Sequence, residues 1–471
     1  MDSQQPPLQL NTPDGDHGAH TSVKPSQDVR ALSALSASAE AGTSTSCETE
    51  LMEAILEPRN LRRALQRVQT NAGAPGVDGV TVENFPEQLR DKWPQIADAL
   101  RAGTYRPAPV RRVDIPKPGG QGTRMLGIPT VLDRFIQQAV LQVLTPEFDP
   151  DFSPSSFGFR PGRSAHDAIL QAQTYLNEGF VWVVDLDLEK FFDRVNHDIL
   201  MARVARRVTD KAVLRLIRRY LQAGILDEGV VMARTEGTMQ GGPLSPLLAN
   251  ILLDDWDKEL ERRGHRFVRY ADDCNIYVRS ERAAQRVFKT ARRFLEHRLK
   301  LRVNGTKSRV GRPETLKFLG FTFYPGRAGY RIQVAPQSAQ RLKATVRRLT
   351  RHGRGPIALV IFDLNRYLRG WVGYFRLADL AGTFKDLDGW IRHRLRAYQW
   401  RQWPRIRTRL KKLRALGLPE CRAWEIAFSR KGPWRTAHGP LNSALPNAYW
   451  GQQGLFALHS AHQRFHRGNP R

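Results

Sequence analysis

The sequence predicts an α+β fold followed by an all-helical region, and three observations support this. Residues 181–188 (VWVVDLDL) form an apolar, β-branched run, which predicts a buried strand. Residues 266–279 predict a β-hairpin whose apolar strands flank a short Ala-Asp-Asp turn. Helical patterns alternate with these strands, but only helical patterns appear after residue 336.

Composition divides the 471 residues into four expected parts. Residues 1–48 are rich in Ser, Thr, Pro, Gly and Asp and are expected to be a disordered leader. Residues 49–335 form the α+β region, residues 336–430 the helical region and residues 431–471 a C-terminal extension. Helices are expected near residues 48–69, 84–102, 133–145, 197–207, 210–223, 242–263, 281–300, 337–351, 357–376, 383–403 and 405–415, and further strands near 316–324 and 330–334.

The charge of the chain points to a polyanionic partner. Lys and Arg total 74 against 46 Asp and Glu, which gives a formal net charge of +28. Such a balance suits nucleic acid or an anionic membrane surface. The apolar runs are short and interrupted by Arg or Asp, and the N-terminus lacks the features of a signal peptide. We therefore expect nucleic acid as the partner and no membrane association.

The cysteines are few and far apart. Cys47, Cys274 and Cys421 form no CxxC pair, so a four-cysteine zinc site is excluded and a disulfide framework is not expected. A reducing compartment, the cytoplasm, is the expected location.

Three acids are candidates for metal chemistry. Asp187 ends the predicted strand, and Asp272 and Asp273 occupy the predicted turn. Two-metal phosphoryl transfer needs carboxylates gathered on rigid backbone, and Mg²⁺ prefers such oxygen ligands. The alternative is ordinary turn chemistry, because Asp favours turns. Asp185 leaves the choice within the strand open, since it lies two residues before Asp187 on the same strand face.

An ordered set of nine motifs goes beyond these single features. It resembles the reverse transcriptases of group II introns, the intron-encoded maturases. The motifs are APGVDG (74–79), PVRRVDIPKPGG (109–120), RMLGIPTVLDRFIQQ (124–138), SSFGFRPGRSAHDA (155–168), DLDLEKFFDRVNHD (185–198), GTMQGGPLSPLLANILL (237–253), RYADD (269–273), LRVNGTKS (301–308) and KFLGFTF (317–323).

The resemblance implies a right-hand polymerase fold. Residues 49–335 would form the fingers and the palm, with an antiparallel sheet and helices, and residues 336–430 the helical thumb or maturase domain (domain X). Residues 431–471 lack paired cysteines, so no HNH endonuclease is expected. Among the intron classes, the chain looks most like the compact class C proteins.

The resemblance also assigns the metal site. Asp187 matches the first catalytic aspartate, Asp272 and Asp273 complete the catalytic acids, and Asp185 is the neighbouring non-catalytic acid. Leu188 would offer its backbone carbonyl to a metal. Two Mg²⁺ ions are expected, with Mn²⁺ as a substitute.

Six further residues match the family's dNTP pocket. Phe192 matches the bulky residue that excludes a ribose 2′-hydroxyl, although alone it would be read as a core aromatic. Lys117 and Arg124 match the pair that holds the triphosphate, although each alone would be a solvated surface cation. Gln240 would line the pocket, and Gly241 would let the nucleotide approach the backbone closely. Lys307 would face the nucleotide or the primer.

The helical region resembles the family's thumb through LNRYLRGWVGYF at residues 364–375. Between Trp390 and Arg414 there are ten Lys or Arg residues and no acid, interleaved with aromatic residues. Arg and Lys contact phosphates, whereas aromatic rings stack on bases or pack in the core. Core packing is favoured for Trp371. The candidates for RNA contact are Arg392, Arg394, Arg401 and Arg405, with a solvated face as the alternative.

The resemblance implies an RNA-directed DNA polymerase that extends a primer 3′ hydroxyl with dNTPs on an RNA template. Its partners would be its parent group II intron RNA, the RNA template/DNA primer duplex and target DNA, and it would assist splicing and retrohoming. Two alternatives stay open: an RNA-binding splicing cofactor without polymerase activity, and a domesticated reverse transcriptase that serves defence or repair.

The net charge predicts how RNA binding responds to salt. Neutralised phosphates release counterions, so the affinity for RNA should fall with a log–log slope of about −0.7 to −0.9 per phosphate contacted. Filter binding or fluorescence anisotropy over a KCl series measures that slope. A flat response would contradict an interface dominated by backbone phosphates.

Overall fold

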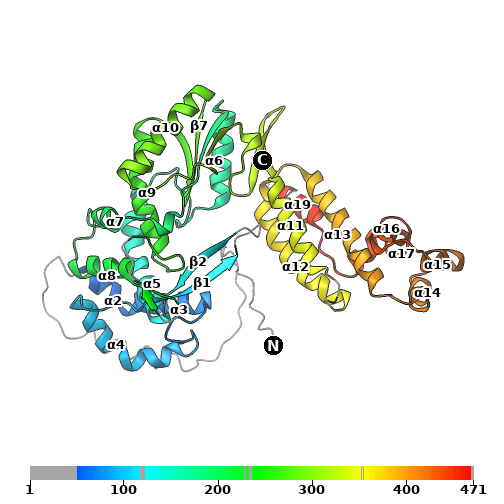
Figure 1. Cartoon of the computed structure of the whole chain (residues 1–471), viewed down its shortest axis with the longest axis horizontal. Helices are drawn as coiled ribbons and strands as arrows, with labels where there is room; N and C mark the ends of the chain where they lie inside the picture. The colour runs from blue at the N-terminus through cyan, green and yellow to red at the C-terminus, as the bar shows by residue number, and fades with distance from the viewer. Residues whose placement is uncertain are drawn as a thin grey trace. The chain divides into compact units, whose positions relative to one another are not determined.

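The structure is a computed structural model that describes residues 50–116, 122–227, 230–232, 236–351, 353 and 355–467 (Figure 1). The expected leader, residues 1–48, lies outside them. The chain divides into two compact units. The first comprises Met1–Tyr175 and Gly179–Gly311, and the second comprises Leu176–Glu178 and Arg312–Arg471.

In its described residues, the first unit contains α-helices and two sheets, which confirms the α+β prediction. Its helices are α2 (Glu50–Leu56), α3 (Pro58–Asn71), α4 (Phe85–Arg101), α5 (Val131–Phe148), α6 (Ala165–Asn177, whose last two residues belong to the second unit), α7 (His197–Val204), α8 (Lys211–Gln222), α9 (Ser245–Arg262) and α10 (Glu281–Arg298). Its strands are β1 (Val110–Pro116), β2 (Thr123–Ile128), β3 (Trp182–Leu186), β4 (Ile225–Asp227), β5 (Val230–Met232), β6 (Arg266–Tyr270), β7 (Asp273–Val278) and β8 (Arg309–Gly311).

Polar side chains start several of these helices, because the first N–H groups of a helix lack partners within it. Thr130 accepts a hydrogen bond from the backbone of Asp133 and begins α5. Asp210 accepts from two backbone N–H groups at the start of α8. The first expected helix, near residues 48–69, is instead two helices, since Pro58 begins α3 and cannot continue α2.

One sheet has the strand order β6-β7-β3-β8, and all of its pairs are antiparallel. β3 pairs with β7 from Trp182↔Val278 to Leu186↔Cys274. β6 pairs with β7 up to Tyr270↔Asp273, which closes the expected hairpin. In Figure 1, α9 and α10 lie beside this sheet, and their buried residues join its apolar residues in one core.

The second sheet has the order β2-β1-β4-β5 and was not predicted. β1 pairs antiparallel with β2 and parallel with β4. The sequence VRRVDIP lacks the strict alternation that marks a strand with one buried face, which explains the omission. Helix α6 was also missed.

In the second unit, a short 3-10 helix (Pro313–Thr315) and the hairpin of β9 (Phe321–Gly326) and β10 (Gly329–Val334) precede the α-helices. The helical region after residue 336 is confirmed. Its helices are α11 (Pro336–Leu349), α12 (Ile357–Tyr374), α13 (Ala381–Arg401), α14 (Ile406–Ala415), α15 (Glu420–Ala427), α16 (Pro433–His438), α17 (Pro440–Ala444), α18 (Asn447–Gln452) and α19 (Leu458–Arg467).

Hairpin β9–β10 belongs with the helices. The Phe321 ring lies 5.0 Å from the Phe375 ring, and the backbone N–H of Ile332 donates to Asp379 at 2.7 Å. The compact units therefore divide at Gly311, whereas the sequence places the change of character at residue 335. The four-part division by sequence stays a prediction.

The prediction that Trp371 packs in the core is confirmed, because Trp371 is buried and its ring lies 4.6 Å from the Phe375 ring. Over the residues that the structure describes, no helix is both long enough and apolar enough to span a membrane.

Asp388 ties α13 to the start of α19, because its two carboxylate oxygens accept from the N–H groups of Leu458 and His459 at 2.9 Å. Asp388→Ala should lower the free energy of unfolding by about 1–2 kcal/mol, as loss of a helix cap does. Urea denaturation measures the change. Asp386→Ala, on the exposed side of the same helix, is the control and should change it little. Equal effects of both variants would contradict the role of the cap.

Candidate active site

The sheet register brings the two candidate acidic segments together. β3 ends at Leu186, which is paired with Cys274, and Asp187 is the next residue. β7 begins at Asp273. Continued by one residue, the same antiparallel register sets Asp187 opposite Asp273. Residues far apart in the sequence thus lie at the same end of the sheet, and their shared role as metal ligands stays a prediction.

The turn between β6 and β7 is tighter than expected, because Asp273 is already part of β7. Only Ala271 and Asp272 connect the strands. Ala271 has a φ of 57°, a left-handed conformation that L-residues other than Gly rarely adopt. A positive φ at the first connecting residue suits a two-residue hairpin turn. Asp272 is half-buried and Asp273 is exposed.

Asp187 is fixed by the segment that leads into β8. Its backbone N–H donates to the Ser308 hydroxyl at 3.0 Å, and its carbonyl accepts from Asn304 N–H at 2.8 Å and from the Ser308 hydroxyl at 3.2 Å. Both partners belong to the motif LRVNGTKS, but the sequence gave no reason to single them out. Ser308 is therefore a supporting residue that sequence reasoning missed.

The Asp187 carboxylate offers an oxygen for a metal. Oδ2 is buried and accepts no hydrogen bond, and its ion-pair partner is the Lys307 ammonium at 3.4 Å. Such an oxygen is a suitable hard ligand for Mg²⁺. Within the described ranges, no three His, Cys, Asp or Glu side chains already converge as a metal site. Carboxylates repel one another, so a cation would supply the attraction that draws them together.

The segments of two candidate dNTP residues that follow β3, Phe192 and Gln240, are linked through backbone hydrogen bonds. Phe192 is half-buried in a short 3-10 helix (Phe191–Asp193), and its carbonyl accepts from Thr238 N–H at 2.6 Å. Two residues further, the Gln240 carbonyl accepts from Gly127 N–H at 3.0 Å. The structure thus brings the segments of Phe192 and Gln240 together, next to strand β2.

Gly241 is required at its position. Its φ is +121°, and a Cβ there would lie 2.8 Å from the carbonyl oxygen of Gly127. Lys117 lies outside the described residues, as does the side chain of Arg124, whose backbone belongs to β2. The roles of both in holding the triphosphate stay predictions.

Cys274, next to the carboxylates, is not a nucleophile. Burial raises the pKa of its thiol to about 12, and the nearby charge of Asp257 acts in the same direction. The thiol is therefore protonated at neutral pH.

Comparison with known proteins gives two family matches. Residues 115–323 match the reverse transcriptase (RNA-dependent DNA polymerase) family, and residues 339–416 match the group II intron maturase-specific domain. Protein YkfC of Escherichia coli K12 is 34% identical over 300 residues, which cover 55% of this chain and 78% of that protein. The chain belongs to the group II intron reverse transcriptases.

Two further comparisons are more partial. The group II intron-encoded protein LtrA of Lactococcus lactis subsp. cremoris is 38% identical over 212 residues, which cover 45% of this chain and 35% of LtrA. A chain of a partial Cas6-RT-Cas1–Cas2 complex is 25% identical, covering 55% of this chain and 46% of that chain. Its TM-score is 0.35, too low to support a structural conclusion. By family, this reverse transcriptase is an enzyme of the RNA-directed DNA polymerase class.

The maturase-specific match of this reverse transcriptase contains the four arginines that the sequence selected. Arg394 is engaged within the protein: its Nε donates to the Thr350 hydroxyl at 3.0 Å, and its guanidinium lies 5.9 Å from the Trp390 ring. Burial lowers the pKa of Arg394. Arg405, by contrast, is exposed at the start of α14. The four residues therefore differ in their surroundings, and their contacts with RNA stay predictions.

Proposed function

We propose that this reverse transcriptase extends a primer 3′ hydroxyl with dNTPs on an RNA template by two-metal phosphoryl transfer. The observation that carries the proposal is the register of β3 and β7. It sets the end of the strand that leads to Asp187 beside the turn that holds Asp272 and Asp273. Two short, paired backbone segments keep these acids closer to fixed positions than loops would.

Mg²⁺ is the metal that this donor set favours, with Mn²⁺ as a substitute. Asp187 would contribute its buried Oδ2, which accepts no hydrogen bond, Asp272 and Asp273 their carboxylates, and Leu188 its backbone carbonyl. When bound, the ions would activate the primer hydroxyl and stabilise the charge that develops on the phosphoryl group. Lys307, beside Asp187, would place a positive charge near the phosphates of the nucleotide or the primer.

The remaining pocket residues would select and hold the nucleotide. Phe192 would block the space that a ribose 2′-hydroxyl needs. Gln240 and Gly241 would line the pocket. The Gly127 carbonyl lies so close to Gly241 that a side chain at residue 241 would not fit between the two backbone segments. Lys117 and Arg124 would bind the triphosphate through charge-assisted hydrogen bonds.

The domain roles complete the proposal. Residues 49–335 would act as fingers and palm and residues 336–430 as thumb and maturase domain, with 431–471 as an extension. The basic helical region would bind the parent intron RNA and the template–primer duplex and assist splicing and retrohoming into target DNA. Support comes from the maturase-specific match at residues 339–416 and from the net charge of +28. The cytoplasm, with association with the bacterial nucleoid, would be the location of this activity.

Asp272→Ala should reduce cDNA synthesis by about a hundredfold or more, because it removes a carboxylate from the metal site. Splicing of the parent intron should survive, since the RNA-binding surface is unchanged. Primer extension on an RNA template and a splicing assay measure the two activities. Asp98→Ala, an exposed acid on α4, is the control and should retain both.

Two outcomes would contradict this assignment. Equal inactivity of the wild type and Asp272→Ala in primer extension would favour a splicing cofactor without polymerase activity. Loss of splicing together with cDNA synthesis would show that the two roles are not separable.

Phe192→Ala should admit ribonucleotides. Removing the ring opens space for the 2′-hydroxyl, and the ratio of kcat/KM for dNTP to that for rNTP should fall by about tenfold or more. Single-nucleotide incorporation with matched dNTP and rNTP measures the ratio. Phe192→Tyr keeps the ring and should preserve discrimination. An unchanged ratio in Phe192→Ala would assign Phe192 to the core instead.

A further inference from the structure

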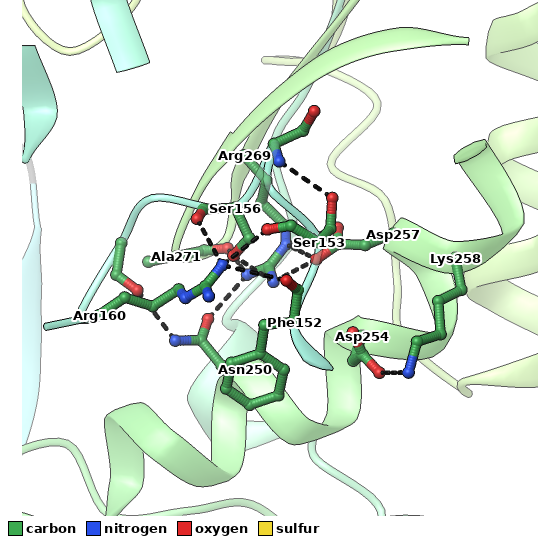
Figure 2. A network of polar contacts seen from close by, with 12 residues as sticks. Phe152, Ser153, Ser156, Arg160, Asn250, Asp254, Asp257, Lys258, Arg269 and Ala271 are labelled. Carbon is green, nitrogen blue, oxygen red and sulfur yellow. Dashed lines mark hydrogen bonds and ion pairs between the residues drawn. The ribbon is translucent and has the colours of Figure 1, made fainter. Parts of the chain in front are cut away.

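The turn that carries Asp272 rests on a group of buried polar residues, shown in Figure 2. We call it the bracing network and define it as Ser156, Asn250, Asp257 and Arg269. All four are at most 2% exposed. They come from three separate segments: the loop before α6, helix α9 and strand β6.

Arg269 is the centre of the bracing network, and each of its donor nitrogens is used. Nε donates to Asp257 at 2.8 Å, and Nη2 donates to Asp257 and, at 2.8 Å, to the Ser156 hydroxyl. Nη1 donates to the Asn250 side-chain oxygen at 2.9 Å and to the Ala271 carbonyl at 3.0 Å. A planar guanidinium can hold several acceptors in fixed directions, which an ammonium cannot.

The contact with Ala271 bears on the turn itself. Ala271 has the left-handed φ of 57°, so its conformation must be held by its surroundings. Its carbonyl immediately precedes Asp272, and the Arg269 guanidinium fixes the direction of that carbonyl. The orientation of the peptide unit that leads into Asp272 thus depends on a side chain buried behind the turn.

A second support comes from the motif SSFGFRPGRSAHDA. The Arg269 N–H donates to the Ser155 carbonyl, and the Phe157 N–H donates to the Arg269 carbonyl, each at 2.9 Å. Gly158 then lies directly against the turn, because a Cβ on it would be 2.3 Å from the Ala271 nitrogen. Asn250 joins the two supports, since its amide nitrogen donates to the Gly158 carbonyl at 2.9 Å.

The loop that bears Ser156 is itself held by another buried arginine. Arg160 is 8% exposed and pairs with Asp149 at 2.7 Å. Its Nη1 donates to the carbonyls of Ser153 at 2.6 Å and Ser156 at 3.1 Å. The supporting surface behind the turn is therefore built from directional hydrogen bonds and does not depend on apolar contact alone.

We propose that Arg269, with Gly158 as its steric counterpart, is a positioning residue that sets the affinity of the catalytic acids for divalent metal. The inference rests on the proposed function of Asp272 and Asp273 as metal ligands. Arg269 is too buried to touch substrate, so it acts through the backbone of the turn. Apolar residues of similar volume would fill the space but would not fix the direction of the Ala271 carbonyl.

The test compares two substitutions that affect the support of the turn, which we call the brace variants, with one matched substitution elsewhere in the first unit. Arg269→Lys keeps the positive charge beside Asp257 but loses the forked contacts. Gly158→Ala keeps every side chain of the bracing network but places a methyl group 2.3 Å from the Ala271 nitrogen, so the backbone of the turn must shift. The control is Arg219→Lys, which removes a guanidinium that clamps the carbonyls of Gly103 and Tyr105 at 2.6 and 2.7 Å, in the same unit.

The primary readout is Mn²⁺ binding, which is measured by electron paramagnetic resonance of the free Mn²⁺. The Mn²⁺ binding that is lost in Asp272→Ala is the binding that belongs to this site. Arg269→Lys and Gly158→Ala should each weaken that binding by about tenfold, as changes behind metal ligands do. The Mg²⁺ concentration that half-saturates primer extension should rise in parallel, with little change in the KM for dNTP. Arg219→Lys should lower the melting temperature but keep the wild-type Mn²⁺ affinity.

The outcomes separate positioning from general destabilisation. Wild-type Mn²⁺ affinity in folded Arg269→Lys and Gly158→Ala would refute the proposal, and so would equal weakening in Arg219→Lys. If the two brace variants do not fold, Ser156→Ala removes a single acceptor of Arg269 and should still weaken Mn²⁺ binding measurably; wild-type affinity there would refute the proposal.

The same measurement distinguishes failure of this inference from failure of the proposed function. A wild-type protein with Asp272-dependent Mn²⁺ binding but without cDNA synthesis would overturn the polymerase proposal and leave the positioning role supported by the brace variants. A wild-type protein without any Asp272-dependent binding would overturn the positioning role, because no metal site would exist for Arg269 to hold.

Discussion

The site depends on one constraint, the antiparallel register between β3 and β7. Leu186 pairs with Cys274, and the next step along the sheet brings Asp187 to Asp273. A slip of one residue would turn every side chain of a strand to the opposite face and would bury the acids or move them apart. The apolar residues of β3 and β7 prevent such a slip, because Val184 and Ile276 are fully buried in the core of the first unit.

Backbone hydrogen bonds then convert this register into a defined site. The carbonyl and N–H of Asp187 are both held by the segment that contains Asn304 and Ser308. In the turn that leads into β7, Ala271 is kept in a left-handed conformation, which costs on the order of 1–2 kcal/mol. Backbone strain of this kind persists only where the surrounding residues hold the conformation. Here the buried Arg269 guanidinium does so, because it donates a hydrogen bond to the Ala271 carbonyl.

The arginines of the helical unit have different surroundings, so they do not all serve as one basic surface. Arg396 is buried and donates to the Leu445 carbonyl at 2.8 Å, and Arg409 lies 4.3 Å from the Trp400 ring. Arg405 remains exposed. A run of basic residues that would be read as one solvated face thus contains arginines that hold helices together. An exposed arginine such as Arg405 can meet the phosphates of an RNA without giving up a contact that holds helices together.

The sequence by itself determined the elements whose signal is local. The β-branched run before Asp187, the hairpin around Asp272 and most helices follow from periodicity within a few residues, and the order of motifs identified the family. Tertiary structure alone decided the side-chain partners of Arg269, which lie 12 to 113 residues away in the sequence. It also decided the role of Ser308 and the packing of hairpin β9–β10 on the helices. Local patterns cannot specify such partners, since they are chosen by how the folded segments pack and by which buried polar groups need one another.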